Sequence, residues 1–198
     1  MNSVSRGVAA ILAAGFACFA SPLSAQTGDV KVGMITTLSG PGSGLGIDVR
    51  DGFALALKDL GGTLGGLKAT VIEGDDQQKP DVGKQKTEKL VQSDKVDFIV
   101  GYIWSNVLLA SLKTAVDSKT FLISANAGPS QLAGELCSPY VFSTSWQNDQ
   151  TPAAMGLYMN QKGVKSVFLI GPNYAAGKDM LAGLKSTFKG QIVGEEYT

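Results

Sequence analysis

The sequence predicts an α/β fold in which helices cover both faces of a parallel sheet. Three observations lead to this prediction. Short β-rich apolar segments alternate with longer segments whose apolar residues recur every three to four positions. The connections between strands are long enough for crossover helices, which parallel pairing requires. Glycine and small polar residues follow the strand segments, where α/β proteins place their ligand-binding loops.

The individual elements follow from the same periodicity. Residues 30–36 are a β-rich run, a glycine-rich loop covers residues 39–46, and a helical pattern then runs to the glycine pair at 61–62. Further strands are predicted at residues 69–73, 97–100, 121–124, 140–142 and 166–170, with a last one from residue 191. Further helices are predicted at residues 80–94, around 107–115, at 152–161 and at 175–188.

The composition narrows the function. The chain has 198 residues, with 17 Lys and Arg against 17 Asp and Glu, 44% hydrophobic residues and no His. This apolar fraction suffices for a packed core, and the charge balance gives no positive excess for nucleic acid. Without His, His-dependent triads and most catalytic zinc sites are excluded. We expect a binding protein and not an enzyme, with no cofactor, no metal site and no nucleic-acid partner.

The first 25 residues have the pattern of a secretory signal. Arg6 precedes a run of small and apolar residues from 7 to 20, which is shorter than the roughly 20 residues of a bilayer-spanning helix. Pro22 and small residues follow, so cleavage is expected after Ala25. A buried helix or a membrane anchor is the alternative. The signal reading predicts export to the periplasm.

The two cysteines indicate neither a disulfide nor a nucleophile. Cys18 lies inside the signal, and the residues before it form a poor lipidation motif. Cys137 is then the single cysteine of the exported chain, so no intramolecular disulfide can form. It has no His partner and precedes a Ser-Pro turn. We interpret it as a structural or incidental thiol.

Two loops near the amino terminus have competing interpretations. The glycines of residues 40–46 alternate, so the spacing of a dinucleotide fingerprint is absent. This loop is either a flexible turn or a place where backbone approaches a ligand, with a nucleotide site as the least favoured alternative. Residues 73–76 hold three carboxylates, which serve glycoside hydrolysis, bind a cation or, more commonly, form a solvated strand end.

The loop at residues 101–106 is the most informative one. It follows an apolar strand and opens the next helix, and Ser105 is expected at the N-cap. A capping hydroxyl and free backbone N–H groups form an anion site, and Trp104 supplies a flat apolar wall. Ser105 is therefore either a plain N-cap or an N-cap that also holds a ligand carboxylate.

Two later loops carry further candidates. Residues 124–130 end a strand with small side chains, which let amides reach a ligand, and Asn126 could bind its polar end. An ordinary turn is the alternative. Tyr174 lies in the equivalent loop of a second lobe and is a candidate aromatic lid.

Several segments together resemble the branched-chain amino-acid-binding (leucine-binding) type of periplasmic solute receptor. The resemblance runs from about Val30 to the last residue, and it implies a type I clamshell of two doubly wound parallel-sheet lobes. The segments that carry it are MITTLSGP, GFALALKDLGG, DDQQKPDVGKQKTEKLVQSDKVDFIVG, FLISANAGPSQLAG, SPYVFSTSWQNDQ and NYAAGKDMLAGLK.

The resemblance also implies a binding site. The ligand-facing serine of the family matches Ser105, and its loop of small residues matches Asn126, Ala127 and Gly128. Gly128 stands where amino-acid binders often have Thr, so its backbone N–H alone remains. Leu45 replaces a common aromatic residue, and Ala176 replaces a tyrosine in the second lobe, with Tyr174 nearby. These departures leave room for a bulkier carboxylate, such as an aromatic acid, stacked on Trp104.

The family resemblance implies delivery of a small carboxylate, either an amino acid or an aromatic acid, to the membrane permease of an ABC importer. The alternatives are a ligand-sensing receptor module of the same fold and a secreted α/β hydrolase. We expect a signal peptide at 1–25, a first lobe at 26–147 and the start of a truncated second lobe at 148–198. Family members are roughly twice as long, and a full-length version is expected to be a monomer.

Overall fold

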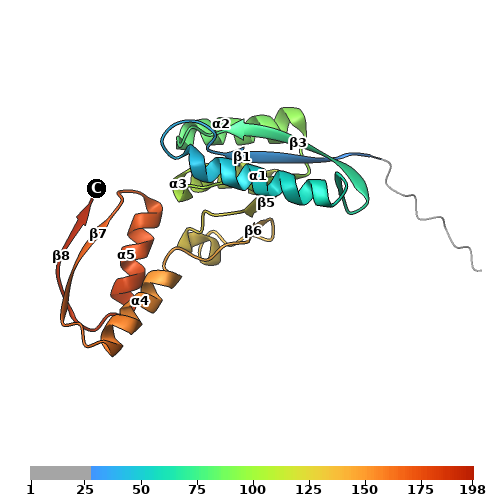
Figure 1. The fold of residues 1–198 in the computed structure, drawn as a ribbon. Coiled ribbons are helices and arrows are strands. Elements are labelled where there is room, and N and C mark those ends of the chain that lie inside the picture. Colours follow the sequence, from blue (N-terminus) through green and yellow to red (C-terminus); the bar gives the residue numbers. More distant parts are fainter. Residues whose placement is uncertain (1–27) are drawn as a thin grey trace, which may run out of the picture.

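A computed structural model describes residues 28–198, so the expected signal and its cleavage site lie outside the described residues. The chain forms two α/β units, which we call the first and second lobes (Figure 1). The strands are β1 (Val30–Thr36), β2 (Thr63–Leu64), β3 (Leu67–Asp75), β4 (Phe98–Gly101), β5 (Phe121–Ser124), β6 (Val141–Ser143), β7 (Ser166–Gly171) and β8 (Gln191–Tyr197). The helices are α1 (Ser43–Asp59), α2 (Pro80–Lys89), α3 (Ser105–Asp117), α4 (Gln150–Gln161) and α5 (Ala175–Thr187), with a π turn at Leu90–Asp94 and a 3-10 turn at Ser130–Ala133.

The first lobe contains a six-stranded sheet in the order β2-β3-β1-β4-β5-β6. All neighbouring pairs are parallel except β2 and β3, which form an antiparallel hairpin. The prediction of a parallel sheet missed this hairpin. Gly65 and Gly66, both at positive φ, separate the two-residue strand β2 from β3, so a glycine turn sets the pairing.

Helices lie on both faces of this sheet, as the sequence predicts. Successive residues of β1 point to opposite faces, so Ile35 joins the core beneath α2 and α3 while Met34 lies on the side of α1. Both side chains are almost completely buried. The main core of this lobe comprises Ile35, Leu90, Val96, Ile99, Tyr102, Val107, Leu108, Leu112, Ala115, Leu122 and Ala127.

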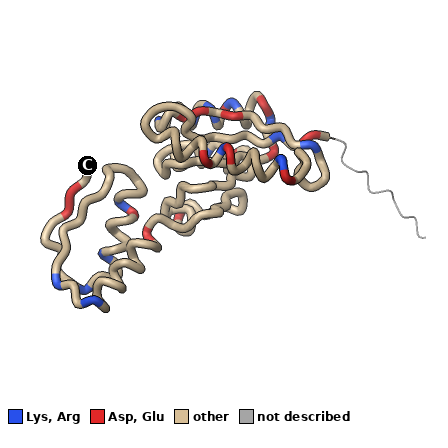
Figure 2. The backbone as a smooth tube through the Cα atoms, in the orientation of Figure 1, with Lys and Arg blue, Asp and Glu red and all other residues tan. Residues whose placement is uncertain are grey.

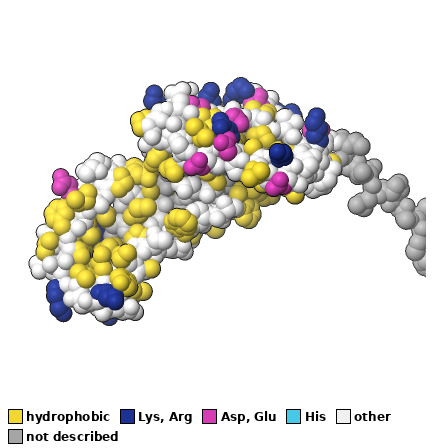
Figure 3. All heavy atoms as spheres, viewed as in Figure 1, with side chains coloured by type: hydrophobic (Ala, Val, Ile, Leu, Met, Phe, Trp, Pro, Cys, Tyr) yellow, Lys and Arg dark blue, Asp and Glu magenta, His cyan; other side chains and the backbone are white. Residues whose placement is uncertain are grey.

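In the second lobe, α5 packs on the parallel pair β7-β8, and α4 packs against α5. The core of this lobe is smaller and consists of Leu169, Leu181, Leu184 and Phe188. Gly156 of α4 lets the helices approach, because an added Cβ would lie 2.9 Å from the carbonyl oxygen of Leu184. The charged side chains lie mainly over the first lobe, whereas hydrophobic side chains gather on the visible face of the second lobe (Figures 2 and 3).

Large hydrophobic side chains are exposed on both lobes. In the first lobe, Phe121 stacks on Phe98 with ring centroids 5.9 Å apart and also contacts Phe142 at 6.1 Å. In the second lobe, Ile170 of β7 is 64% exposed. Within residues 28–198, no helix has the length and apolar character needed to cross a membrane.

Candidate ligand-binding site

The loop after β4 is fixed by an unusual backbone. Gly101 has a φ of +117°, and an added Cβ would lie 2.2 Å from the carbonyl oxygen of Ile35. Tyr102 follows at a φ of 62°, its N–H donates to the carbonyl of Ile35, and its ring is completely buried. Burial raises the pKa of Tyr102 to about 12, so its phenol stays neutral and shares a 2.7 Å hydrogen bond with Thr87. This turn places Trp104 at the carboxyl end of the inner strand β4.

Trp104 is held by residues at the ends of two neighbouring strands. Its Nε1 donates to Oγ1 of Thr37 at 2.9 Å, directly after β1. Thr37 donates in turn to Oδ1 of Asp76 at 2.6 Å, directly after β3. The order of donors is determined because the indole N–H cannot accept. The indole is therefore fixed by a chain of two hydrogen bonds.

Asp76 is fully buried, so the interpretation of residues 73–76 as a solvated strand end is wrong for this residue. Desolvation raises the pKa of its carboxyl, and the hydrogen bonds from Thr37 and from the N–H of Gln78 oppose that rise without cancelling it. Its second oxygen, Oδ2, has no hydrogen-bond partner among the described residues. Sequence reasoning missed both Thr37 and Asp76 as supports of Trp104.

The glycine-rich loop approaches this cluster through two of its glycines. An added Cβ on Gly42 would lie 2.5 Å from the Trp104 ring, and one on Gly46 would lie 1.9 Å from the carbonyl oxygen of Thr37. These glycines let the loop and α1 pack against the protein itself. Leu45, between them, is 54% exposed.

Ser105 is buried but is not an N-cap, contrary to the prediction. Trp104 occupies the cap position of α3, and no side chain caps the helix. The Oγ of Ser105 instead accepts a hydrogen bond from Nδ2 of Asn148 at 3.0 Å. The capping expectation failed because α3 begins at Ser105 itself, one residue past the cap, and its hydroxyl meets a partner from 43 residues further along the chain.

The loop after β5 uses much of its polar capacity internally. Nδ2 of Asn126 donates to the carbonyl of Ile103 at 2.9 Å, and the N–H of Ala127 donates to the carbonyl of Tyr102 at 3.0 Å. Asn126 is exposed, whereas Ala127 is buried. The expected free amide at Ala127 is thus already engaged.

Gly128 is buried in the same loop, where residues 146–148 pass close to its backbone. An added Cβ would lie 2.2 Å from the carbonyl oxygen of Trp146, and the Gly128 carbonyl accepts from the N–H of Asn148 at 2.8 Å. Gly128 also borders a hollow of about 250 Å³ beside β6. That hollow contains none of the other predicted site residues.

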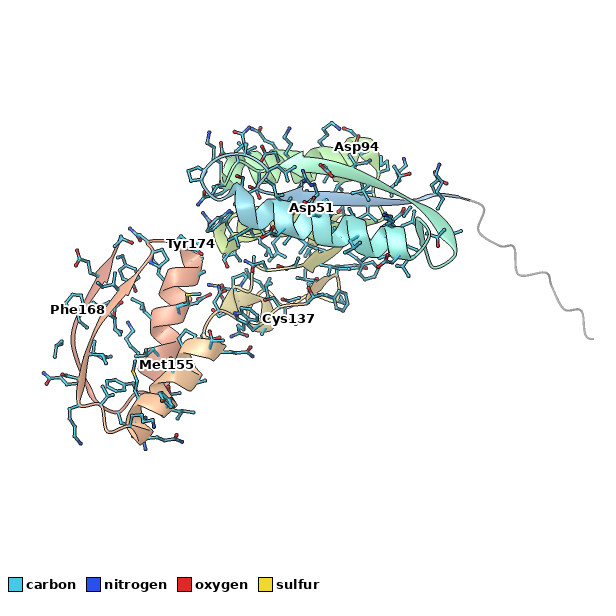
Figure 4. The ribbon with its side chains drawn as sticks, in the orientation of Figure 1. Asp51, Asp94, Cys137, Met155, Phe168 and Tyr174 are labelled. Carbon is cyan, nitrogen blue, oxygen red and sulfur yellow. The ribbon has the colours of Figure 1, made fainter. Side chains whose placement is uncertain are left out.

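Tyr174 brings the second lobe to this region. It precedes α5, at the end of that helix nearest the first lobe (Figure 4). Its half-buried ring meets Trp104 edge to face, with centroids 6.0 Å apart and planes at 67°. Burial raises the pKa of Tyr174, so the phenol is neutral at physiological pH. Ala176, two residues on, is buried.

Trp104 of the first lobe and Tyr174 of the second lobe are thus in contact, next to the buried Ser105. No group of three or more Cys, Asp or Glu side chains within residues 28–198 is placed to hold a metal ion. A family model described as periplasmic binding protein matches residues 29–198. The chain belongs to the periplasmic binding protein family.

Relatives of this periplasmic binding protein are named for, or were crystallised with, different ligands. The Leu/Ile/Val-binding protein homolog 6 of Brucella abortus (strain 2308) is 28% identical over 174 residues, covering 87% of this chain and 44% of the relative. An ABC transporter solute-binding protein from R. palustris in complex with benzoate is 34% identical with a TM-score of 0.83, covering 86% of this chain and 48% of that one.

A third relative extends this comparison. It is the ABC transporter solute-binding protein of Rhodopseudomonas palustris BisB5 in complex with 3,4-dihydroxybenzoic acid, at 32% identity and a TM-score of 0.80, covering 85% of this chain and 47% of that one. These structures confirm the expected type I fold. The periplasmic binding protein chain spans about half the length of these relatives.

Proposed function

We propose that this chain is the receptor of an ABC importer and captures a small carboxylate between its two lobes. The observation that carries the proposal is the contact of Trp104 with Tyr174 beside the buried Ser105. Aromatic rings supply an apolar surface for a planar ligand, and a serine hydroxyl supplies a donor for an anion. An aromatic carboxylate satisfies both groups.

The ligands bound in structures of the relatives support the same ligand class, aromatic carboxylates. Two solute-binding proteins that are 32% and 34% identical to this chain were crystallised with benzoic acid derivatives or benzoate. Branched-chain amino acids are the second class, because the curated relatives are named as Leu/Ile/Val-binding homologues. Trp104 favours the aromatic acids, since its indole offers a flat wall.

The proposal extends to the site, the lobes and the route of the protein. Export to the periplasm follows cleavage after Ala25, and the ligand passes to a membrane permease. The lobes divide at residues 147 and 148, and a full-length receptor acts as a monomer without catalysis. The proposed ligand contacts are Leu45, Trp104, Ser105, Asn126, Ala127, Gly128, Tyr174 and Ala176.

A thermal-shift series tests the proposal. Benzoate, 4-hydroxybenzoate, 3,4-dihydroxybenzoate, isoleucine and leucine are added to the purified chain, with glucose as the neutral control. A carboxylate present at 100 times its dissociation constant adds about 2.7 kcal/mol to the free energy of unfolding. Stabilisation by at least one carboxylate and not by glucose is the expected result. Turnover of a chromogenic ester, without stabilisation by any acid, would contradict it.

A further inference from the structure

The described chain has a hydrogen-bond network that joins the two lobes at Ser105. The side-chain amide of Asn148, just before α4, is almost fully buried. Its Nδ2 donates to Oγ of Ser105 at 3.0 Å and to Oδ2 of Asp179 at 3.1 Å. Asp179 comes from α5 of the second lobe. One amide group therefore contacts the candidate ligand residue of the first lobe and a carboxylate of the second lobe at once.

Asp179 is also bonded directly to the first lobe, through Ser130. Its Oδ2 also accepts from the backbone N–H of Ser130 at 3.0 Å, and its Oδ1 accepts from the Ser130 hydroxyl at 2.9 Å. Ser130 begins the 3-10 turn after β5. Three donors thus converge on one carboxylate, which is the pattern of a charge-assisted contact.

The chemistry of these groups fixes the direction of every bond. A carboxylate accepts and does not donate, so Asp179 requires the NH₂ end of the Asn148 amide to face it. That same nitrogen faces Ser105, so the Ser105 oxygen must accept. The Ser105 hydroxyl proton then remains free, and within residues 28–198 it is donated to no other group in the hydrogen-bond network.

We propose that Asn148 and Asp179 are positioning residues that set the Ser105 hydroxyl as a donor toward a ligand carboxylate. This inference rests on the proposed function. Asp179 sets the orientation of the amide, and the amide sets the polarity of the serine. Neither side chain needs to touch the ligand. Selectivity for an anion over a neutral analogue is the property that they control.

The test compares benzoate with benzamide, its neutral analogue, by isothermal titration calorimetry. Asn148→Asp reverses the direction of the hydrogen bond, because a carboxylate at this position accepts from the Ser105 hydroxyl. That hydroxyl can then no longer donate to the ligand. The ratio of the two affinities is expected to fall about ten- to hundredfold, the scale of a hydrogen bond to a charged group. Ser105→Ala is expected to lower the ratio similarly.

The double variant separates this mechanism from simple charge repulsion. If Asn148 acts through the Ser105 hydroxyl, Asn148→Asp lowers the ratio much less when Ser105 is already Ala. An equal loss in both backgrounds would overturn the inference. Asn160→Asp is the matched structural control, since Asn160 bonds Thr187 and Lys189 within the second lobe. It is expected to leave the ratio unchanged.

A second measurement does not require a ligand. In a ¹⁵N–¹H spectrum, the side-chain NH₂ protons of Asn148 are expected to exchange more slowly than those of the exposed Asn173, and Asp179→Ala is expected to accelerate them. Equal exchange of Asn148 and Asn173 in the unchanged protein would overturn the network. Slow exchange of Asn148 in a protein that no carboxylate stabilises would instead overturn the proposed function.

Discussion

Trp104 and Thr37 are 67 positions apart in the chain, and the indole N–H of one donates to the hydroxyl oxygen of the other at 2.9 Å. The bond ties the loop after β4 to the end of β1. It is continued by the Thr37 hydroxyl, which donates to the buried Asp76. The aromatic wall of the proposed site is therefore supported from behind by groups that a ligand never reaches.

Replacing Thr37 by Val tests this support. The variant keeps the shape of the side chain but removes the acceptor for Trp104 and the donor to Asp76. Leaving a buried carboxylate without this donor costs about 1–3 kcal/mol of unfolding free energy. Urea unfolding measures the loss, and weaker benzoate binding is expected alongside it. Thr70→Val, at an exposed site on β3, is expected to change stability by less than about 0.5 kcal/mol.

Replacing Asp76 by Asn is expected to change the dependence of stability on pH. Because burial raises the folded-state pKa of Asp76, its contribution to stability is present below the ordinary value of 3.8 and is lost as pH rises through the folded value. The neutral amide does not suffer this loss. The variant should therefore gain stability relative to the parent as pH increases from 3.8 to 7.

Urea unfolding across that pH range measures the difference. Asp59→Asn, at the exposed end of α1, is the control and is expected to follow the parent curve. A constant offset between Asp76→Asn and the parent at every pH would contradict the role assigned to burial.

Replacing Gly128 by Ala tests the close approach of residues 146–148 to the loop after β5. The added Cβ would lie 2.2 Å from the Trp146 carbonyl, so the segment that leads to Asn148 must move. Overpacking of this kind costs about 1–3 kcal/mol. Gly52→Ala is a matched control in the middle of α1, where an added Cβ meets nothing within 4 Å. That control should be stabilised by about 0.5–1 kcal/mol, because alanine favours the helix more than glycine.

Exposed apolar residues on β7 allow a prediction about association. Ile170 is 64% exposed, and its neighbour Leu169 is 5% exposed. Ile170→Thr is expected to reduce self-association in light scattering while it changes unfolding by less than about 0.5 kcal/mol. Leu169→Ala should cost about 2–5 kcal/mol, because it leaves a cavity in the core. Unaltered association in Ile170→Thr would remove this surface as the cause.

The alternation of strands and helices could be predicted from the sequence because it depends on local periodicity. The structure places β5 at residues 121–124, as predicted, and begins and ends most other elements within one or two residues of the expected positions. The β2 hairpin and the 3-10 turn were missed. They are short, and no periodicity develops over two to four residues.

The proposed site was harder to predict than the fold. Trp104 and Tyr174 were identified by their loops, and the structure brings their rings together. Asn148 had a weak signal, since it lies at the boundary expected between the two lobes, at residues 147 and 148. Asp179 had none, because it lies inside α5 and its partners come from 31 and 49 positions away. Contacts of that range depend on how the lobes are placed.

The contact of Trp104 with Tyr174 also gives the protein an intrinsic fluorescence reporter of the distance between its lobes. Within residues 28–198, it is the aromatic pair that joins one lobe to the other. Excitation energy passes from a tyrosine to a tryptophan with an efficiency that falls steeply with separation. A change in the angle between the lobes therefore alters the fluorescence intensity of Trp104. Ligand binding can then be followed without a label, even though no product forms.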